Sequence, residues 1–219
     1  NSPLNGDVIR SAEQLKYISV AFTGIDHIDR EACLEKGIRM SNAAGYCTDD
    51  VAELVIGMMI HLLRSIKAAD AAVRDSGTKT GLPAFALSGK SVGIIGVGAI
   101  GRRVAELCRA FGCKVIGYSR HKSDSAAEEG IEYKTLDEVM AESDIVTLHV
   151  PLTASTRAMI SAEKIAMMKK TAYLINCARG AVVDYFALTD ALNSGIIAGA
   201  AIDVYEDEPP IARDHPLMS

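Results

Sequence analysis

The chain has 219 residues, of which 49% are hydrophobic and 23% charged, with 28 acidic against 23 basic side chains and a net charge of -5. This length and composition exclude a disordered chain and a collagen, and they predict a globular protein of one large domain or one and a half. The acidic balance argues against a broad basic surface for nucleic acid or for an anionic membrane.

The cysteines predict free thiols rather than disulfides or a metal site. The five are scattered, with no C-x-x-C pair and no histidine at zinc-finger spacing. The chain also has no apolar run of about 18 residues and no signal-peptide pattern at its start, so we expect a cytoplasmic protein. Because it begins without Met, in what reads as a loop, we expect a truncated chain.

Short β-branched runs alternate with helical patterns, which is the order typical of a parallel sheet covered by helices. The sequence therefore predicts an α/β, Rossmann-type doubly wound fold. The expected strands are residues 17–21, 91–95, 114–118, 144–149, 172–176 and 198–203, and the expected helices are residues 100–111, 136–141, 161–168 and 185–194.

Residues 50–75 predict one long helix. Apolar side chains recur there at spacings of three and four. Asp50 and Glu53 fit a capping arrangement at its start, and Gly77 and Gly81 should end it. We interpret it as a connector between domains; the alternative is an ordinary helix that covers the sheet.

A glycine loop joins the second expected strand to the helix after it. The loop reads G-V-G-A-I-G, a dinucleotide-binding pattern when it stands between a strand and a helix. Gly96 allows the tight turn, Gly98 lets the backbone approach a pyrophosphate, and Gly101 permits close packing of helix on strand. The first N–H groups of the helix, at Ala99 and Ile100, would face the phosphates. The alternative is a purely structural strand-turn-helix.

The strand expected at residues 114–118 should end beside the adenine ribose. NAD-specific sites place Asp or Glu there, about 20 residues beyond the glycine loop. This chain instead has Ser119, Arg120, His121 and Lys122, which can bind a 2′-phosphate and do not repel it. We therefore expect NADP(H) to be preferred over NAD(H). The alternative is that Arg120 and Lys122 are solvated loop charges and NAD is used.

Further motifs follow one another in order along the chain. They are T-G-I-D-H-I-D from Thr23, N-A-A-G-Y from Asn42, V-A-E from Val51, H-V-P-L-T from His149, N-C-A-R-G from Asn176, V-D from Val183, A-I-D-V-Y from Ala201 and E-P from Glu208. With the glycine loop, they resemble the D-isomer-specific 2-hydroxyacid dehydrogenase family, which includes D-3-phosphoglycerate dehydrogenase, hydroxypyruvate/glyoxylate reductases and D-lactate dehydrogenase. The resemblance covers essentially the whole chain.

The resemblance implies an enzyme of two lobes, in which a flavodoxin-like substrate domain built from both ends of the chain embraces a Rossmann-type cofactor domain. Residues 1–46 correspond to an incomplete substrate domain. Residues 47–219 correspond to the NAD(P)-binding domain, which we expect to be incomplete at its C-terminus. We interpret the chain as a fragment that lacks the family's opening strands and everything after Ser219.

Reducing a 2-oxo acid requires a cation for the carboxylate and ketone oxygen, a proton donor, and a group that tunes the donor. Arg179 is the candidate cation, because it follows an expected strand at its carboxyl end and its planar guanidinium can hold a carboxylate at two points. By resemblance, Glu208 is the residue that holds the catalytic His and raises its pKa. Glu206 and Asp207 lie beside it and complicate the assignment.

The resemblance also implies the residues that contact cofactor and substrate. Asp203 matches the residue that contacts the nicotinamide carboxamide. The turn at Phe22, Thr23 and Gly24 would bind the substrate carboxylate through backbone N–H groups, and Gly24 leaves room for close approach. Other cofactor contacts are implied for His149, Val150, Pro151, Thr153, Cys177 and Ala178.

The family's proton donor is a His about 20 residues beyond the position of Glu208, whereas the chain ends 11 residues beyond it. His215 comes too early, and spacing assigns the role to none of the other four histidines. We therefore expect the 219-residue chain alone to be inactive. The alternative is a non-catalytic dinucleotide-binding protein, like the dinucleotide-sensing corepressors of this fold. Arg179 and Glu208 count against it, because a binding module needs neither.

Substrate and assembly are predicted only coarsely. The basic residues between Asn1 and Tyr46 are dispersed, which favours a small unphosphorylated acid. The family implies a homodimer that forms partly through the helix expected at residues 50–75. Apolar side chains spread over more than one face of that helix. They are Met58, Met59, Leu62 and Leu63, which could equally be intrachain core.

Overall fold

The computed structural model describes residues 3–120, 130–206, 208 and 210–218. It divides into two compact units, Asn1–Thr48 and Asp49–Ser219, which are described in turn. The domain boundary predicted from the sequence lies two residues before this division. The predicted roles of these units, as substrate and cofactor domains, stay predictions.

The first unit is a small βα arrangement. It contains α1 (Gly6–Ser11), β1 (Tyr17–Val20), α2 (Arg30–Glu35) and β2 (Arg39–Asn42), and the two strands pair in parallel. Sequence patterns predicted β1 but neither helix nor β2. Its own core consists of Ile9, Ile18, Val20, Ile28, Ala32, Cys33 and Ile38.

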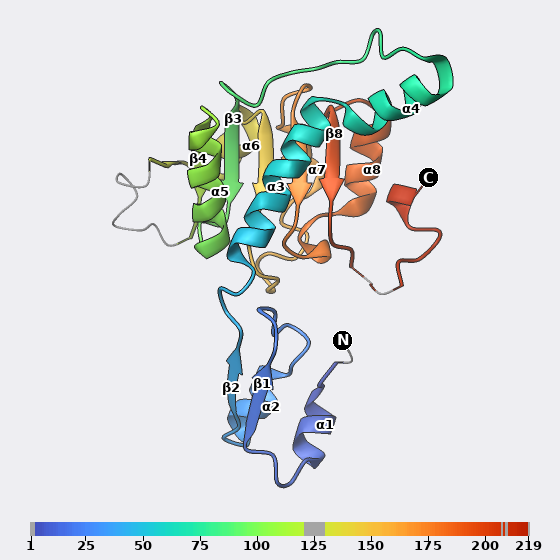
Figure 1. Cartoon of the computed structure of the whole chain (residues 1–219). Helices are drawn as coiled ribbons and strands as arrows, with labels where there is room; N and C mark the ends of the chain where they lie inside the picture. Colours follow the sequence, from blue (N-terminus) through green and yellow to red (C-terminus); the bar gives the residue numbers. More distant parts are fainter. Residues whose placement is uncertain (1–2, 121–129, 207, 209, 219) are drawn as a thin grey trace. The chain divides into compact units, whose positions relative to one another are not determined.

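The second unit contains a parallel sheet whose strands lie in the order β5-β4-β3-β6-β7-β8. Figure 1 labels β4, β3 and β8 of this sheet. This order confirms the predicted α/β doubly wound class, and the five longer strands confirm five of the predicted runs. The short β5 had not been predicted. The strands are β3 (Ser91–Ile95), β4 (Lys114–Tyr118), β5 (Glu132–Tyr133), β6 (Ile145–Leu148), β7 (Tyr173–Asn176) and β8 (Gly199–Ile202).

Helices cover both faces of this sheet because alternate strand residues point to opposite sides. Val92 and Ile94 pack with α3 (Thr48–Leu63) and α5 (Ala99–Ala110). Ile95 instead belongs to the core on the other face, which is covered by three further helices. Those helices are α6 (Leu136–Glu142), α7 (Ala162–Ala166) and α8 (Tyr185–Asn193), and two short 3-10 turns lie at Gly180–Val182 and Pro216–Met218.

The single long helix predicted for residues 50–75 is wrong, because the chain breaks it into α3 and α4 (Ile66–Ser76). Ser65 adopts a left-handed conformation with φ of 48°. Its hydroxyl donates to the carbonyl of Pro83 at 2.9 Å. A contact with a residue 18 positions later therefore compensates for the strained backbone, and no local glycine or proline signals the break.

The two ends of this helical region differ in how well they were predicted. Helix α3 begins at Thr48, so the capping arrangement expected at Asp50 is wrong. Helix α4 ends as predicted at Gly77, which has a φ of +71° and donates its N–H to the carbonyl of Val73. The first half covers the sheet with five buried residues, whereas α4 buries none.

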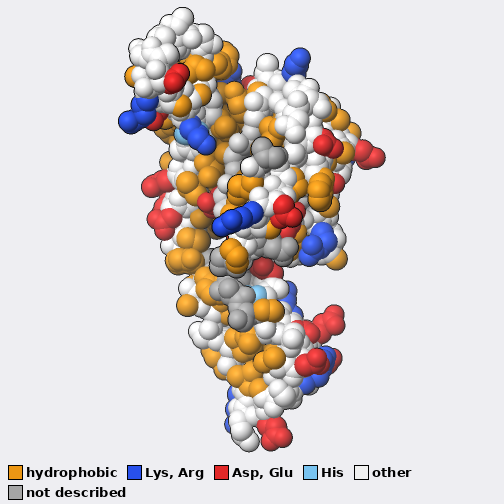
Figure 2. Space-filling model, turned by 90° about the vertical axis from the view of Figure 1, so that its right-hand side faces the viewer, with side chains coloured by type: hydrophobic (Ala, Val, Ile, Leu, Met, Phe, Trp, Pro, Cys, Tyr) orange, Lys and Arg blue, Asp and Glu red, His pale blue; other side chains and the backbone are white. Residues whose placement is uncertain are grey.

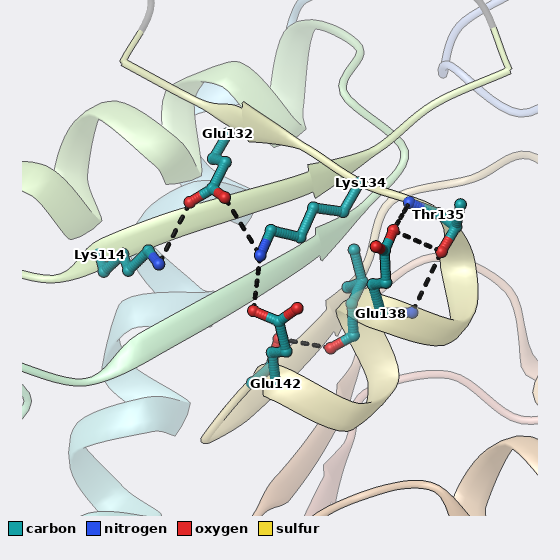
Figure 3. Close-up of polar contacts among 8 residues, drawn as sticks. Lys114, Glu132, Lys134, Thr135, Glu138 and Glu142 are labelled. Carbon is teal, nitrogen blue, oxygen red and sulfur yellow. Dashed lines mark hydrogen bonds and ion pairs between the residues drawn. The ribbon is translucent and has the colours of Figure 1, made fainter.

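An ion-pair network holds the short β5 to its neighbours (Figure 3). Glu132 accepts from Lys114 at 3.2 Å and from Lys134 at 3.1 Å, and Lys134 also reaches Glu142 at 2.6 Å. These side chains join β4, β5 and α6. A capping box formed by Thr135 and Glu138 starts α6. The edge of the sheet is thus fixed by side chains rather than by a long ladder.

None of the helices in the described residues is long and apolar enough to span a membrane. Acidic and basic side chains are interspersed on the face drawn in Figure 2.

Candidate functional site

The sheet reverses its strand order at β3, which pairs with β4 on one side and with β6 on the other. In open α/β sheets, ligands bind outside the carboxyl ends of the strands at such a switch point. Three connections start at this edge: the glycine loop after β3, residues 119–120 after β4, and residues 149–157 after β6. The candidate site is built from these and from the turns after β7 and β8.

The three glycines of the loop differ in what surrounds them. Gly96 has a φ of +100°, and a Cβ built on it would lie 2.6 Å from the carbonyl of His149. A Cβ on Gly101 would lie 2.2 Å from the carbonyl oxygen of Gly96. A Cβ on Gly98 would have no heavy atom within 4 Å. Two of the glycines are therefore required by the protein's own packing, and Gly98 leaves open space at the start of α5.

The start of α5 suits an anion. Gly98 is the N-cap and makes no side-chain cap, and the first turn carries no acidic residue. The first N–H groups of a helix lack intrahelical partners and form the positive end of its dipole. Ala99 and Ile100 provide such N–H groups beside the open space at Gly98. A phosphate fits this arrangement.

The residues predicted for the adenine ribose are only partly described. Ser119 is half-buried and Arg120 is exposed at the end of β4. Arg120 donates from Nη1 to the hydroxyl of Ser155, which lies in the connection after β6, at 3.2 Å. His121 and Lys122 lie outside the described residues.

The end of β6 supports the glycine loop from below. His149 donates its backbone N–H to Ile95 at 2.7 Å, and its carbonyl contacts Gly96. Its Nε2 lies 3.0 Å from the hydroxyl of Thr147. Burial lowers the pKa of His149 to about 4, so the imidazole is neutral at pH 7. The adjoining residues predicted to contact cofactor, Val150, Pro151 and Thr153, lie along the same connection.

The end of β7 brings a thiol against α3. Cys177 is half-buried and its Sγ lies 3.6 Å from the Sδ of Met58. Burial, aided by the charge of Asp203, raises the pKa of this thiol to about 12. Cys177 therefore stays protonated and serves as a packing group rather than a nucleophile.

A buried asparagine fixes the turn that carries Arg179. Asn176 donates from Nδ2 to the carbonyl of Arg179 at 3.0 Å and accepts from the N–H of Ala178 at 3.0 Å. Arg179 is half-buried, and its Nη1 donates to the carbonyl of Ala178 at 2.7 Å. A Cβ on Gly180 would lie 2.1 Å from the backbone of Tyr205. The turn after β7 thus packs directly on the chain after β8.

Tyr185 connects these two turns. Its hydroxyl donates to the carbonyl of Val204 at 2.6 Å and accepts from Asn176 at 3.4 Å. Burial raises the pKa of this phenol. The ring of Tyr185 also packs with those of Tyr205 and His215, whose centroids lie 6.1 and 5.2 Å away. Sequence reasoning missed Asn176 and Tyr185 as site residues.

The acidic segment after β8 contains a histidine–carboxylate pair. His215 accepts from the N–H of Leu217 at Nδ1, so its Nε2 carries the hydrogen and donates to Glu206 at 3.2 Å. Glu208, the predicted catalytic residue, is exposed. Asp203 is also exposed, and its N–H donates to the carbonyl of Asn176 at 3.0 Å. The structure thus pairs His215 with Glu206, nine residues away, and no sequence spacing signalled this pair.

In the first unit, the predicted carboxylate-binding turn follows the carboxyl end of β1. Asn42 donates from Nδ2 to the carbonyl of Thr23 at 2.7 Å, and Ala43 donates its N–H to Phe22 at 3.3 Å. The turn that ends at Gly24 is therefore held to the last residue of β2 and to the residue that follows it. Within the part of the chain that the structure describes, no three His, Cys, Asp or Glu side chains are grouped as a metal site requires.

Comparison with known proteins is consistent with this geometry. Residues 56–219 match the family described as D-isomer specific 2-hydroxyacid dehydrogenase, NAD binding domain. The chain is 44% identical over 216 residues to D-3-phosphoglycerate dehydrogenase of Methanocaldococcus jannaschii, covering 97% of this chain and 41% of the relative. It is 41% identical over 212 residues to glyoxylate reductase of Thermococcus litoralis, covering 93% and 64%. The chain thus spans less than two thirds of these relatives.

Two solved structures have folds that closely match this chain. A D-lactate dehydrogenase of Aquifex aeolicus, complexed with NAD and lactic acid, superposes with a TM-score of 0.91 at 37% identity, covering 98% of this chain and 68% of that one. The acyclic imino acid reductase Bsp5, in complex with NADPH and D-Arg, superposes with a TM-score of 0.91 at 31% identity, covering 100% and 69%.

Proposed function

Because the chain belongs to the D-isomer-specific 2-hydroxyacid dehydrogenase family, we propose that the protein transfers a hydride between a nicotinamide dinucleotide and a small 2-oxo acid or D-2-hydroxy acid. The observation that carries this proposal is the open space at Gly98, at the switch point of the sheet. Arg179 follows β7 on the same carboxyl edge.

The described residues fit a dinucleotide. The bound cofactor supplies or accepts the hydride at its nicotinamide ring. Gly98 would leave room for its pyrophosphate, and Ala99 and Ile100 would offer backbone N–H groups to it. The backbone carbonyl of His149 and the side chain of Val150 pack against the loop at Gly96. Asp203 and the chain at Cys177 and Ala178 would hold the nicotinamide end.

The catalytic chemistry falls to residues at the ends of β7 and β8. The Arg179 guanidinium would hold the substrate carboxylate and polarise the ketone, which stabilises negative charge on the ketone oxygen. The family resemblance implies a histidine as proton donor to this oxygen, a role that spacing assigns to none of the five histidines of this sequence. Glu208 would hold that histidine and favour its charged form.

We assign NADP(H) as the preferred cofactor. Arg120 follows β4 directly and can pair with a 2′-phosphate, and neither Ser119 nor Arg120 is a carboxylate that would repel it. Titration with NADH and NADPH separately checks this assignment. A clear preference for NADH would refute it.

The substrate proposal rests on the first unit. The turn at Phe22, Thr23 and Gly24 follows the carboxyl end of β1, and its backbone N–H groups would take the substrate carboxylate. The basic residues of the unit are dispersed, and two of them are engaged within it. Arg10 pairs with Glu35, and Lys36 donates to three carbonyls at the end of α1. A small, unphosphorylated 2-oxo acid suits this surface best.

We further propose a cytoplasmic homodimer. The five cysteines are free thiols, as a reducing compartment requires. The helix α4 buries no residue within the chain and exposes Ile66 and Val73. A second copy of the chain would cover these side chains.

The experiment is a substrate screen of the full-length protein with NADPH. Oxidation of NADPH should be measured at 340 nm with glyoxylate, hydroxypyruvate, pyruvate and 3-phosphohydroxypyruvate, and the product should be the D-hydroxy acid. Binding of NADPH without turnover of any oxo acid would refute the enzyme and favour a dinucleotide-binding protein. The pairing of His215 with Glu206 does not decide between the enzyme and the binding protein, because the catalytic role was assigned to Glu208 and to neither of these two side chains.

A further inference from the structure

A chain of hydroxyl groups connects Arg120 to a buried anchor. Arg120 donates to Ser155 at 3.2 Å, and the Ser155 hydroxyl lies 3.1 Å from that of Thr153. Thr153 in turn lies 3.0 Å from the hydroxyl of Thr156. Thr156 is only 5% exposed and donates to the carbonyl of Pro151 at 2.7 Å.

These contacts have one consistent direction. Because the hydrogen of Thr156 goes to Pro151, the Thr156 oxygen must accept from the Thr153 hydroxyl. Thr153 then accepts from Ser155, and Ser155 accepts from Arg120. Thr156 also accepts the N–H of Thr153 at 2.8 Å, which fills its remaining lone pair. Each hydroxyl both donates and accepts, so the bonds polarise one another.

The chain of hydroxyls crosses the candidate cofactor site. Arg120 follows β4 and Ser155 lies beyond β6, and these strands flank β3 on its two sides. The bond from Arg120 to Ser155 therefore joins the connections that follow the two neighbours of β3, the strand from which the glycine loop starts. The position of the Arg120 guanidinium therefore depends on buried Thr156, in the connection after β6, as well as on β4.

We propose that Ser155 is a specificity-determining positioning residue, which holds the Arg120 guanidinium where it meets the 2′-phosphate of NADP(H). This inference rests on the proposed cofactor function. An exposed arginine samples many rotamers and must be ordered when it binds an anion. The bond to Ser155 orders it in advance. A guanidinium has five N–H donors, more than this bond uses, so it can pair with a phosphate at the same time.

The test uses two nucleotides that differ in the 2′-phosphate, namely adenosine 2′,5′-bisphosphate and AMP, titrated into the chain by calorimetry. The variant Ser155→Ala should lower affinity for the bisphosphate by about five- to tenfold and leave AMP within about twofold. Ser155→Thr keeps the hydroxyl and should restore the bisphosphate affinity. Ser161→Ala is the matched control, because Ser161 lies in the same connection and its side chain does not cap α7.

A double-mutant cycle tests whether Ser155 acts through the arginine. Arg120→Ala should lower bisphosphate affinity by about 10- to 100-fold. In that background Ser155→Ala should add no more than about twofold, because there is no guanidinium left to hold. Independent, additive losses would overturn the proposal.

Three further outcomes are decisive. Equal losses for both nucleotides in Ser155→Ala would assign Ser155 to the shared part of the ligand and overturn the specificity role. Unchanged bisphosphate affinity in Ser155→Ala would overturn it as well, while leaving the proposed cofactor site intact. Failure of the unmodified chain to bind either nucleotide would instead refute the proposed cofactor site, and the inference with it.

Discussion

Replacing Gly98 by alanine should weaken dinucleotide binding without weakening the fold. Gly98 has φ of -88° and ψ of -160°, which alanine adopts freely, and an added Cβ would meet no heavy atom within 4 Å. Two small effects on the free energy of unfolding oppose each other. A stiffer unfolded chain stabilises by about 0.4–1 kcal/mol, and alanine is a poorer N-cap by about 1 kcal/mol. The melting temperature should therefore change by no more than about 4 °C.

The same Cβ would occupy the space that we assign to the pyrophosphate. We expect Gly98→Ala to lower NADPH affinity at least about tenfold, through steric exclusion and lost N–H contacts. Gly101→Ala is the matched comparison, because its Cβ would lie 2.2 Å from the Gly96 carbonyl. Overpacking there should cost about 1–3 kcal/mol. Calorimetric titration and thermal melting of both variants are the assays. Wild-type NADPH affinity in a folded Gly98→Ala chain would refute the reasoning.

Three further predictions concern the ends of the strands. Burial alone would raise the pKa of Asp144, but its hydrogen bonds with Lys169 and the Ser91 N–H lower it overall. Ionised Asp144 therefore stabilises the folded state above about pH 4, and this stabilisation is lost as the pH falls through the lowered pKa of the folded state. Melting curves of the wild type should drop below about pH 4. Asp144→Asn should reduce this dependence but not remove it, because the pKa values of Glu132 and Glu138 are also lowered. Equal curves for wild type and variant would contradict the prediction. Tyr185→Phe removes the hydroxyl that donates to the carbonyl of Val204 and should lower the free energy of unfolding by about 1–3 kcal/mol, measured by denaturant melts. An unchanged free energy of unfolding would contradict this hydrogen bond. Arg179→Lys in the full-length protein should reduce kcat/KM for the oxo acid at least about tenfold with NADPH affinity unchanged, because the planar guanidinium is lost; wild-type kinetics would exclude the assigned role.

The parts of the fold predicted from the sequence are those set by strong local patterns. The strand before the glycine loop, β3, is a run of apolar residues buried on both faces, and its pattern needs no tertiary information. By contrast, β2 is the polar run R-M-S-N and β5 has only two residues, so neither carries a strand pattern. The break at Ser65 depends on Pro83, far along the chain, and periodicity alone extended the helix through it.

In the candidate site, too, the residues of contiguous motifs could be predicted and the contacts between distant residues could not. The glycines and Arg179 belong to contiguous motifs with known chemistry, so their positions on the carboxyl edge could be predicted. The contact between Arg120 and Ser155 joins residues 35 positions apart, and that between Glu206 and His215 arises from ring packing around Tyr185. Such contacts depend on how strands and connections meet in space, and no spacing in the sequence encodes them.

The placement of the candidate catalytic groups depends on buried side chains that hydrogen-bond to the backbone of the turns after β7 and β8. Asn176 is fully buried and holds the backbone on both sides of the turn at Arg179, and Tyr185 holds the chain after β8 through Val204. Because these bonds form within the core, both turns are fixed when the domain folds, and a ligand does not have to order them. Substitution of Asn176 should therefore alter turnover through the position of Arg179 and leave the pyrophosphate end, formed separately at Gly98, unaffected.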